Sequence, residues 1–450
     1  MKKVITYGTF DLFHQGHYNI LKRAKELGDY LIVGVTTEFY DKNRGKLNVQ
    51  NSLMERINNV KASGLADEII VEEYEGQKIE DIQKYNVDIF AIGSDWKGKF
   101  DYLGEYCDIV YLPRTKGISS TQLRAEKSII IKLGVVGYGR IAQRFIKESK
   151  FVSGVNIEGV YGRDIKRAEQ FSKENELNFF TDSYNELLCN VDAVYIATPH
   201  LSHYEYIKKA LNSNKHVICE KPLVLKKEEA IELYNLAKAK RLVLLEAIKT
   251  AYSPGFLHLT SLAKSGAIGE IKSVEATFTK LVEGNIRELD FEQAGGSTTE
   301  LATYPLIGIV KLLGTKPIES NSYSYYDKKR KVDLFSKLFL NYKNAIAIAT
   351  TGLGVKSEGH MVVSGTNGYI YVPAPWWKTE YFEVRYENSN DNRKYFYKFD
   401  GDGLRYELAE FVKMINGNQL ETYKVTNEES IFIIEIIEKF LSGKDDNIIE

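Results

Sequence analysis

Cysteine, long apolar runs and an excess of charge of one sign are all lacking in this sequence of 450 residues. Its three cysteines, Cys107, Cys189 and Cys219, are far apart and form no CxxC pair, which argues against a disulfide framework or a zinc site and fits a reducing cytosol. No stretch approaches the roughly 20 apolar residues that span a bilayer, and the N-terminus turns polar too early for a signal peptide. The formal net charge of −1 provides no global positive field for nucleic acid or anionic lipid. We therefore expect a cytoplasmic, soluble protein with no membrane or nucleic-acid partner.

Two successive series of strand-like and helix-like runs are what the sequence does contain. The first ends near residue 127 and the second begins at residue 129, and the polar segment AEKS separates them. In both series apolar runs alternate with amphipathic ones, which predicts parallel sheets covered on both faces. After about Tyr252 the strand-like runs lengthen, alternate more cleanly and are joined by Gly/Asn turns, which predicts a mainly antiparallel open sheet. We expect an α/β protein with domains at 1–128, 129–250 and 251–450.

The first candidate site lies where the first strand meets the first helix, in YGTFDLFHQGH. Gly8 and Gly16 permit close backbone approach to a phosphate, and a helix start offers free N–H groups and a favourable dipole. His14 and His17, three residues apart, can both point at one triphosphate. Such a site suits in-line attack on phosphorus, where catalysis is mostly positioning and charge neutralisation. The alternative is a pair of histidines that only caps the helix.

A second anion-binding segment, RTKGISST, follows about a hundred residues later. Arg114 and Lys116 precede a hydroxyl-rich helix start formed by Ser119, Ser120 and Thr121. The two segments together favour a triphosphate ligand over a simple helix cap.

With these motifs, residues 1 to about 127 resemble the nucleotidyltransferases of the cytidylyltransferase superfamily. GTFDLFHQGH, GSDWKGKFDYL and VYLPRTKGIS are similar to glycerol-3-phosphate cytidylyltransferases in particular. The resemblance implies that CTP and a polyol phosphate react, with Mg²⁺, to give a CDP-alditol and pyrophosphate. It implies that His14 and His17 are catalytic and that Asp11 contacts or orients the acceptor. The CTP-binding residues that it implies are Gly8, Thr9, Phe10, Lys46, Asp95, Trp96, Arg114, Ser119, Ser120 and Thr121; for Asp95 and Trp96 a structural turn is the alternative.

A glycine-rich turn, Gly137-x-Gly139-x-x-Ala142, opens the second series between a strand and a helix. In that context the pattern predicts a dinucleotide site, in which Gly137 makes the turn, Gly139 admits the pyrophosphate and Ala142 allows close helix packing. Neighbouring cofactor-binding candidates are Tyr138, Arg140 and Ile141.

The following strand ends in Gly162 and Arg163, where a ribose-binding acid is often found. An arginine there, followed by Lys166 and Arg167, suits a 2′-phosphate, so we expect NADP(H) rather than NAD(H). Because Asp164 follows, NAD(H) is the alternative cofactor. The alternative for the basic cluster is a solvated helix start.

Two further strands end in the segments ATPH and CEKPL. A lysine at the carboxyl end of a parallel strand, as Lys221 is, lies where such sheets bind ligands. The cofactor-binding candidates here are Thr198, Pro199, His200, Glu220 and Lys221. Since His200 and His203 have no further carboxylate or cysteine nearby in sequence, we expect them to border the cofactor and expect no metal site.

Residues 129 to about 450 resemble the glucose–fructose oxidoreductase and inositol dehydrogenase family, in GVVGYGRIA, CEKPL, GGSTTELATYP and GDGLRYELAEFV. The resemblance implies an NAD(P)-binding domain at 129–250 and a substrate-binding and oligomerisation domain at 251–450. It also implies a catalytic Lys221 and an acid/base Tyr304. Glu300 occupies the place of the usual aspartate, and a glutamate can still orient or tune a neighbour.

Both halves together predict a bifunctional enzyme. The second half would reduce or oxidise a small sugar or polyol phosphate, and the first would join the alditol phosphate to CMP. CDP-alditols feed capsule and teichoic acid-type polymers, which is the pathway that the pairing implies. The alternative is a glycerol-3-phosphate cytidylyltransferase with a catalytically silent second half, a scaffold or dinucleotide sensor. Both families commonly form dimers, so we expect a homo-oligomer.

Overall fold

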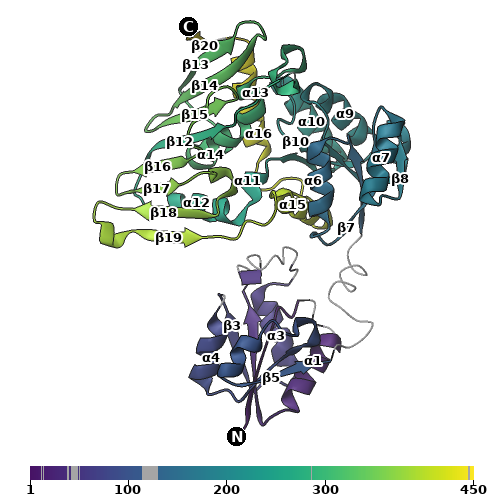
Figure 1. The fold of residues 1–450 in the computed structure, drawn as a ribbon, viewed down its shortest axis with the longest axis vertical. Coiled ribbons are helices and arrows are strands. Elements are labelled where there is room, and N and C mark those ends of the chain that lie inside the picture. The colour runs from purple at the N-terminus through teal and green to yellow at the C-terminus, as the bar shows by residue number, and fades with distance from the viewer. Residues whose placement is uncertain are drawn as a thin grey trace. The chain divides into compact units, whose positions relative to one another are not determined.

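The chain divides into two compact units, Met1–Ile130 and Ile131–Glu450 (Figure 1). The computed structural model describes residues 1–11, 13, 15–37, 40–41, 49, 51–74, 76–113, 130–284, 286–443 and 446–449, and of Asp95 the backbone alone. Within those ranges no helix has the length and apolar character needed to cross a membrane.

The N-terminal unit is built on a parallel sheet with strand order β3-β2-β1-β4-β5. Neighbouring residues of β1, such as Val4 and Ile5, belong to separate apolar clusters, one on each face of the sheet. Burial on both faces explains the apolar runs of these strands. The strands are β1 (Lys3–Gly8), β2 (Tyr30–Thr36), β3 (Glu68–Glu72), β4 (Ile89–Gly93) and β5 (Asp108–Leu112). The helices are α1 (Gln15–Lys25), α3 (Leu53–Ala62), α4 (Gln77–Tyr85), η1 (Ser94–Trp96) and η2 (Asp101–Glu105).

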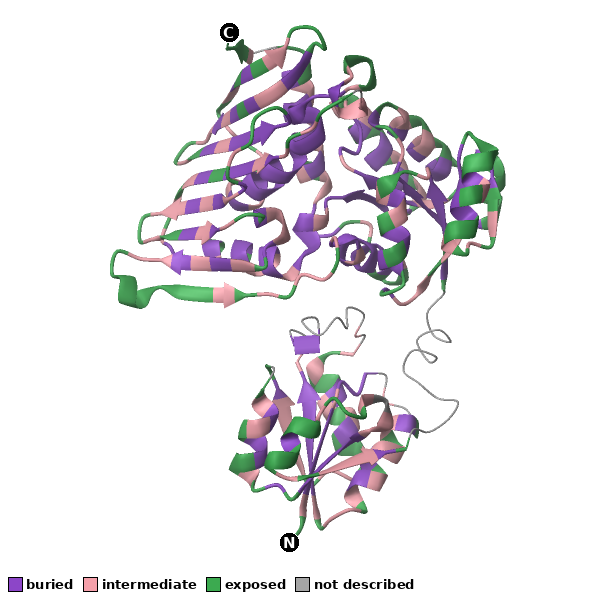
Figure 2. Ribbon diagram, in the orientation of Figure 1, coloured by how far each residue is buried: buried purple, intermediate pink, exposed green. Residues whose placement is uncertain are grey.

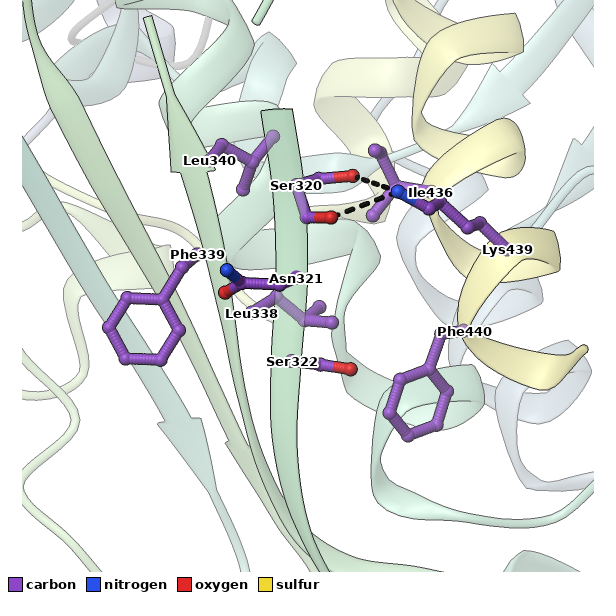
Figure 3. Close-up of a pocket in the computed structure, with 9 residues that line it drawn as sticks. All are labelled: Ser320, Asn321, Ser322, Leu338, Phe339, Leu340, Ile436, Lys439 and Phe440. Carbon is purple, nitrogen blue, oxygen red and sulfur yellow. Dashed lines mark hydrogen bonds between the residues drawn. The ribbon is translucent and has the colours of Figure 1, made fainter. Parts of the chain in front are cut away.

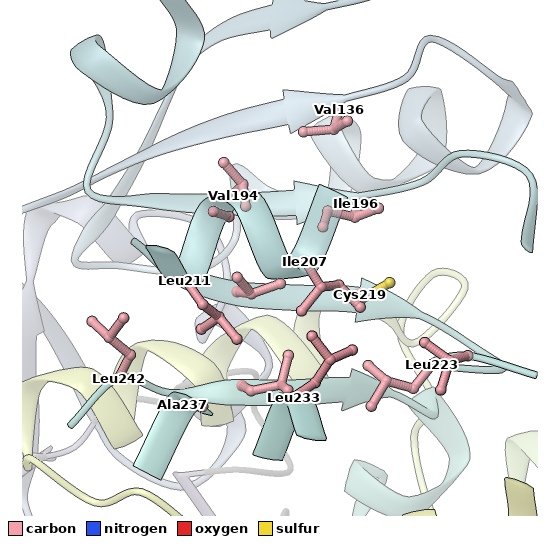
Figure 4. Packing of buried hydrophobic residues seen from close by; sticks show 14 of the residues in the cluster. Val136, Val194, Ile196, Ile207, Leu211, Cys219, Leu223, Leu233, Ala237 and Leu242 are labelled. Atoms are coloured by element: carbon pink, nitrogen blue, oxygen red, sulfur yellow. The ribbon is translucent and has the colours of Figure 1, made fainter. Parts of the chain in front are cut away.

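A second parallel sheet, with strand order β11-β10-β9-β6-β7-β8, begins the C-terminal unit. Figure 4 shows one of its cores, in which Val194, Ile196 and Cys219 of the strands pack against Leu211 and Leu233 of the covering helices. The strands are β6 (Ile131–Val136), β7 (Val155–Tyr161), β8 (Phe179–Thr181), β9 (Ala193–Ile196), β10 (His216–Glu220) and β11 (Leu244–Ala247). The helices are α6 (Arg140–Ser149), α7 (Ile165–Asn175), α8 (Tyr184–Asn190), η3 (His200–Ser202), α9 (His203–Asn212) and α10 (Lys227–Lys240).

The rest of the C-terminal unit is a large mixed sheet with order β19-β18-β17-β16-β12-β15-β14-β13-β20. Neighbours pair antiparallel except β12 with β15 and β13 with β20, which confirms the expected mainly antiparallel sheet. The strands are β12 (Ile271–Thr279), β13 (Glu319–Asp327), β14 (Val332–Asn341), β15 (Ile346–Gly352), β16 (Met361–Gly365), β17 (Tyr369–Val372), β18 (Tyr381–Arg385), β19 (Arg393–Phe396) and β20 (Asp446–Ile448). The helices are α11 (Lys249–Tyr252), α12 (Pro254–Lys264), η4 (Arg287–Leu289), η5 (Phe291–Gln293), α13 (Ser297–Leu301), α14 (Thr303–Leu313), η6 (Trp376–Lys378), η7 (Ser389–Asp391), α15 (Leu404–Asn416) and α16 (Asn427–Leu441).

Helices cover one face of this mixed sheet, and buried residues gather on that side (Figure 2). Helix α16 crosses β13, where Lys439 Nζ donates to the carbonyl and hydroxyl oxygens of Ser320, both at 2.9 Å (Figure 3). The cavity beside this contact measures about 20 Å³. Such a volume holds about one water molecule, so this cavity is no substrate site.

Candidate active sites

The first candidate site lies at the carboxyl ends of β1 and β4, between which the strand order reverses. In open parallel sheets, ligands bind outside the strand ends at such a reversal. Strand β1 ends at Gly8 and leads into Thr9, Phe10 and Asp11, whereas β4 leads into η1 with Trp96. The sheet therefore brings together two of the segments that the sequence singled out.

Buried hydrogen bonds hold the loop after β1. Thr9 Oγ1 donates to Asp41 Oδ1 at 2.8 Å, and Asp11 Oδ1 accepts from the backbone N–H of Asn51 at 2.9 Å. Thr9 is 6% and Asp11 2% exposed. The loop that would carry the nucleotide is thus fixed from beneath by side chains from distant segments.

Phe10 and Gly8 depend on each other in this loop. Phe10 has φ of +52° and buries its ring in the core. A Cβ at position 8 would lie 2.9 Å from that ring. The ring of Phe10 occupies the space that a side chain at position 8 would need. The expected binding of a phosphate by the backbone from Gly8 to Phe10 stays a prediction. A non-glycine residue with this φ is uncommon and often marks a functional loop.

The remaining predicted residues of this site are described only in part. His17 lies in the first turn of α1, with its ring 5.4 Å from the ring of Phe10 and 5.7 Å from that of Phe13, centre to centre. The ring centres of Trp96 and Phe100 lie 5.8 Å apart. The predicted residues outside the described part of the chain are His14, Lys46, Arg114, Ser119, Ser120 and Thr121, together with the side chain of Asp95.

Arg56 of α3 supports the same loop, although the sequence analysis did not select it. Its guanidinium is fully buried and donates through Nη1 to the carbonyls of Thr9 (2.9 Å) and Thr36 (2.8 Å). Nη1 also lies 3.2 Å from Asp41 Oδ2. One sequence pattern could have revealed this role. Arg56 lies three residues after Leu53 and four before Val60, which places a charged residue on the apolar stripe of the helix.

The second candidate site begins at the glycine turn after β6. Gly137 has φ of +104°, and a Cβ there would come within 2.7 Å of the carbonyl oxygen of Ala197. A Cβ on Gly139 would meet no described atom within 4 Å, and no described side chain caps the start of α6. Open space before uncapped backbone N–H groups fits a dinucleotide pyrophosphate. Ile141 follows in the first turn of α6, and Ala142 is fully buried beneath it.

The residues that follow β7 lie where the ribose of a dinucleotide cofactor would bind. The ring of Tyr138 lies over Gly162, where a Cβ would come within 2.0 Å of the ring, and the guanidinium carbon of Arg167 lies 4.6 Å from the ring centre. Asp164 caps α7 through Oδ1, which accepts from the N–H groups of Lys166 (3.0 Å) and Arg167 (3.2 Å). The carboxylate of Asp164 therefore already accepts hydrogen bonds from the first turn of α7. Arg163, the preceding residue, is exposed.

Lys221 and Tyr304 meet at the carboxyl end of β10. Lys221 Nζ donates to the backbone carbonyl of Glu300 at 2.8 Å and lies 5.6 Å from the centre of the Tyr304 ring. Burial, and then the carboxyls of Glu220 and Glu407, raise the pKa of Tyr304 well above its ordinary value. The phenol therefore stays protonated, and its ring lies close to the ammonium of Lys221.

Glu300 turns its carboxylate away from Lys221. Its Oε1 lies 2.7 Å from Arg287 Nη1 and 3.8 Å from His200 Nδ1. Burial, and then the nearby ammonium of Lys221, lower the pKa of His200 well below its ordinary value, so the imidazole is neutral. His203 has both ring nitrogens on backbone carbonyls, those of Pro222 (3.0 Å) and Thr198 (2.9 Å), so it joins the two strand-end loops.

The other cofactor candidates are placed as follows. Thr198 Oγ1 accepts from Ser202 at 2.8 Å, and Pro199 directly precedes η3. Glu220 is buried and accepts from the hydroxyl of Tyr195 at 2.7 Å. Arg140 is exposed, with Nη2 3.8 Å from Glu288 Oε1.

Asp333 of β14 anchors the segment that carries Glu300 and Tyr304. Its Oδ2 accepts from the hydroxyls of Ser297 (2.6 Å) and Ser336 (2.8 Å) and from the N–H of Thr298 (2.9 Å). Burial raises the pKa of Asp333, and these hydrogen bonds oppose that effect. No sequence motif pointed to Asp333, because its partners in α13, Ser297 and Thr298, lie more than 30 residues away.

Comparison with protein families assigns both units of the chain. Residues 5–126 match the family described as cytidylyltransferase-like. Residues 131–247 match the NAD-binding Rossmann fold of the GFO/IDH/MocA oxidoreductase family, and residues 256–371 match the C-terminal domain of that family.

The chain belongs to the cytidylyltransferase-like family in its first unit and to the GFO/IDH/MocA oxidoreductases in its second.

Individual relatives agree with this division. The cytidylyltransferase unit is 54% identical over 126 residues to glycerol-3-phosphate cytidylyltransferase of Bacillus spizizenii, a match that covers 28% of this chain and 97% of that enzyme. The oxidoreductase unit is 27% identical to scyllo-inositol 2-dehydrogenase (NADP(+)) IolU of Bacillus subtilis, over 69% of this chain and 96% of that one.

A solved structure shares the fold of the oxidoreductase unit. The 3-ketoreductase KijD10 of Actinomadura kijaniata, in complex with NADP and TDP-benzene, matches with a TM-score of 0.65 and 21% identity. The match covers 71% of this chain and 99% of that one. The expected assignment of both halves and the expected fold class are confirmed, and the chain combines a cytidylyltransferase with an oxidoreductase that uses a nicotinamide cofactor.

Proposed function

We propose that this chain is a bifunctional enzyme that makes a CDP-alditol. The cytidylyltransferase unit would transfer CMP from CTP to a polyol phosphate, glycerol 3-phosphate or a related alditol phosphate. The oxidoreductase unit would reduce a sugar carbonyl to the alditol with NADPH. The observation that supports an active second unit is that Lys221 Nζ, bonded to the backbone carbonyl of Glu300, lies 5.6 Å from the ring centre of Tyr304, a protonated phenol. A silent scaffold has no need of that arrangement.

In the first reaction, a phosphate oxygen of the acceptor attacks the α-phosphorus of CTP, and the bond to the β-phosphate breaks. His17, with His14, would neutralise charge that develops on the phosphates, and Thr9 with the neighbouring backbone would position the α-phosphate. Mg²⁺ would arrive with CTP, because this ion is commonly held by substrate phosphates and one or two carboxylates.

In the second reaction, NADPH supplies the hydride. The Tyr304 hydroxyl and the Lys221 ammonium would donate hydrogen bonds to the carbonyl oxygen, and one of them would give its proton to the alkoxide as it forms. Phe278 would help exclude water, since its ring lies 5.0 Å from that of Tyr304 and stacks at 3.7 Å on Trp377.

Three observations support NADP(H) as the cofactor. Asp164 is engaged in capping α7, Arg163 is exposed next to it, and Arg167 is placed by the ring of Tyr138. A planar guanidinium suits a 2′-phosphate. IolU is named as NADP(+)-dependent, and KijD10 was solved with NADP.

A second order of steps is favoured by the ligand of KijD10, which is a nucleoside diphosphate compound. In this version CMP transfer comes first, and the oxidoreductase unit acts on the CDP-linked sugar. Either order yields a CDP-alditol, a precursor suited to capsule or teichoic acid-type polymers, and we place the enzyme in the cytoplasm.

We further propose a homo-oligomer that forms through the mixed sheet. Strand register places exposed apolar and aromatic side chains on the face opposite the helices: Tyr323, Tyr325, Ile346, Tyr369 and Phe396. Sedimentation velocity tests this proposal, and a monomer at micromolar concentration would contradict it.

The decisive experiment supplies CTP, Mg²⁺, NADPH and a panel of triose, tetrose, pentose and hexose phosphates, and identifies the CDP-product by mass. Each unit is then assayed with its own substrate supplied directly, an alditol phosphate for CMP transfer and a ketose phosphate or CDP-linked ketose for reduction. In these assays Lys221→Ala should abolish NADPH oxidation and leave pyrophosphate release intact, and His17→Ala should do the reverse. No NADPH oxidation with any compound of the panel, before or after CMP transfer, would favour the scaffold alternative.

A further inference from the structure

Cations exceed anions in direct contacts on the side of the oxidoreductase site that holds Lys221, Lys280 and Arg287. Arg287 Nη1 contacts Glu300 Oε1 at 2.7 Å. Lys280, which directly follows β12, has its Nζ 3.8 Å from Glu288 Oε1, and Arg140 lies at the same distance from that oxygen. Lys221 bonds to a backbone carbonyl, which carries no charge to offset its own. Among these described residues, four cations therefore share two carboxylates.

Other titratable groups nearby do not remove this excess. His200 is neutral, as shown above. Burial raises the pKa of Glu220 and raises that of Glu407 well above its ordinary value, whereas the ammonium of Lys221 opposes the effect on Glu220. Asp402 has its own cation, since its Oδ2 lies 3.5 Å from Arg144 Nε. The site is thus complementary to a substrate that carries negative charge.

Several polar atoms at the same place lack an aligned hydrogen bond within the described part of the chain. Arg287 Nη1, Glu300 Oε1 and His200 Nδ1 are buried and have no such partner. All three meet at Glu300 Oε1, through the contacts of 2.7 and 3.8 Å given above. Buried polar atoms are normally satisfied. Because Arg287 Nη1 and Glu300 Oε1 already form an ion pair, His200 Nδ1 is the atom of the three that a ligand hydroxyl would satisfy.

The fold places Arg287 at this point through a close backbone approach. A Cβ at Gly295 would lie 2.8 Å from the carbonyl oxygen of Arg287, and the N–H of Gly296 donates to the carbonyl of Glu288 at 2.9 Å. Gly295 and Gly296 therefore hold η4 close to the start of α13. The guanidinium of Arg287 reaches Glu300 from there.

We propose that Lys280 and Arg287 form a receptor for a phosphate ester of the oxidoreductase substrate. The inference rests on the proposed reductase function and specifies its substrate class. The ester is either the monoester of a free sugar phosphate or the diphosphate of a CDP-linked sugar. Both forms bring negative charge that would pair with the excess of cations. The sugar hydroxyls would contact Glu300 and His200.

The test compares matched neutral and phosphorylated ketoses with the full-length enzyme, by NADPH absorbance and without CTP. The pairs are dihydroxyacetone and its phosphate, ribulose and ribulose 5-phosphate, and fructose and fructose 6-phosphate. A third form of each, the CDP-linked ketose, is made beforehand with the Lys221→Ala variant. One of the two charged forms should exceed the neutral sugar in kcat/KM by about 100-fold, because each lost charged hydrogen bond costs roughly tenfold or more.

Variants assign the effect to the receptor. Lys280→Gln should raise KM for the charged form by about tenfold, with little change in kcat and none for the neutral sugar. Arg287→Lys should retain more of the preference than Arg287→Gln. Lys272→Gln is the matched control, since it changes a lysine within β12, the strand that Lys280 follows, and Lys272 pairs with Glu270 at 2.9 Å. Equal kcat/KM for neutral and charged forms, or equal losses on both in Lys280→Gln, would overturn the proposal.

A binding measurement separates this inference from the proposed reductase function. Inorganic pyrophosphate is titrated into the NADPH-loaded enzyme, and the nicotinamide fluorescence is followed. Suppose that pyrophosphate binds saturably, that Lys280→Gln weakens this binding, and that no ketose is turned over. This result would support the phosphate receptor and reject the proposed reductase function. Equal binding by the wild type and by Lys280→Gln would reject the receptor, whatever the turnover.

Discussion

The ammonium of Lys221 donates to the backbone carbonyl of Glu300, and not to its carboxylate, at 2.8 Å. Glu300 is one methylene longer than the aspartate usual in the family, and its carboxylate reaches Arg287 instead. Lys221 therefore keeps a charge that no carboxylate neutralises through direct contact in the described structure. A glutamate at this position is thus compatible with a working site, because a charged Lys221 can stabilise a developing alkoxide.

Tyr304→Phe should lower kcat for NADPH oxidation by a factor of about 10²–10⁴, because the change removes a general acid and little else. The affinity for NADPH, measured by fluorescence, should not change. The pKa of Tyr304 is raised by burial, so the wild-type rate should show no alkaline loss from this residue up to about pH 10. An unchanged kcat in Tyr304→Phe would leave Lys221 as the proton donor.

Arg167→Ala should reduce the preference for NADPH over NADH by roughly 10-fold or more, since a charge-assisted contact to the 2′-phosphate is lost. The ratio of the two kcat/KM values is the measurement. Lys166→Ala is the control, because Lys166 is equally charged and exposed but does not stack on Tyr138. Equal effects of both variants would indicate a diffuse basic surface.

Arg56→Met should destabilise the cytidylyltransferase unit by about 3–5 kcal/mol, because it leaves Asp41 as a buried charge without its cation. Loss of pyrophosphate release after mild heating, with NADPH oxidation preserved, is the expected result. Lys61→Met changes an exposed lysine of the same helix and should have little effect. A heat-stable Arg56→Met enzyme would show that Asp41 finds another partner.

The stability of the oxidoreductase unit should fall as the pH rises from about 4.5 to about 7. Burial raises the pKa of Glu246 to about 7, whereas the unfolded chain loses this proton near its ordinary value of 4.5. Between those values the folded state binds more protons than the unfolded state, so rising pH favours unfolding, by about 3 kcal/mol in total.

Urea unfolding at pH 5 and pH 8 measures this effect. Glu246→Gln mimics the protonated form and can keep the hydrogen bond from the N–H of Leu223, which is 2.9 Å long. The variant should therefore lose less stability than the wild type between the two pH values. The same pH dependence in both proteins would mean that Glu246 does not titrate in this range.

The strands, the glycine turn at Gly137 and the positions of His17 and Lys221 could be predicted because each depends on neighbours close in sequence. Apolar runs fix burial on both faces of a parallel sheet, and a glycine turn between a strand and a helix predicts the dinucleotide site. The contact between Gly8 and the ring of Phe10 could not be predicted, because it depends on the unusual backbone conformation of Phe10.

By itself, the sequence determined two nucleotide-binding units and the strand ends at which their sites lie, because local periodicity and turn chemistry carry that information. Only the tertiary structure decided that Arg56 and Asp41 support the first loop, that Asp333 anchors α13, and that Glu300 pairs with Arg287. These contacts join residues from separate elements. Their formation depends on how buried charges find partners when the elements pack, and no periodic pattern encodes that choice.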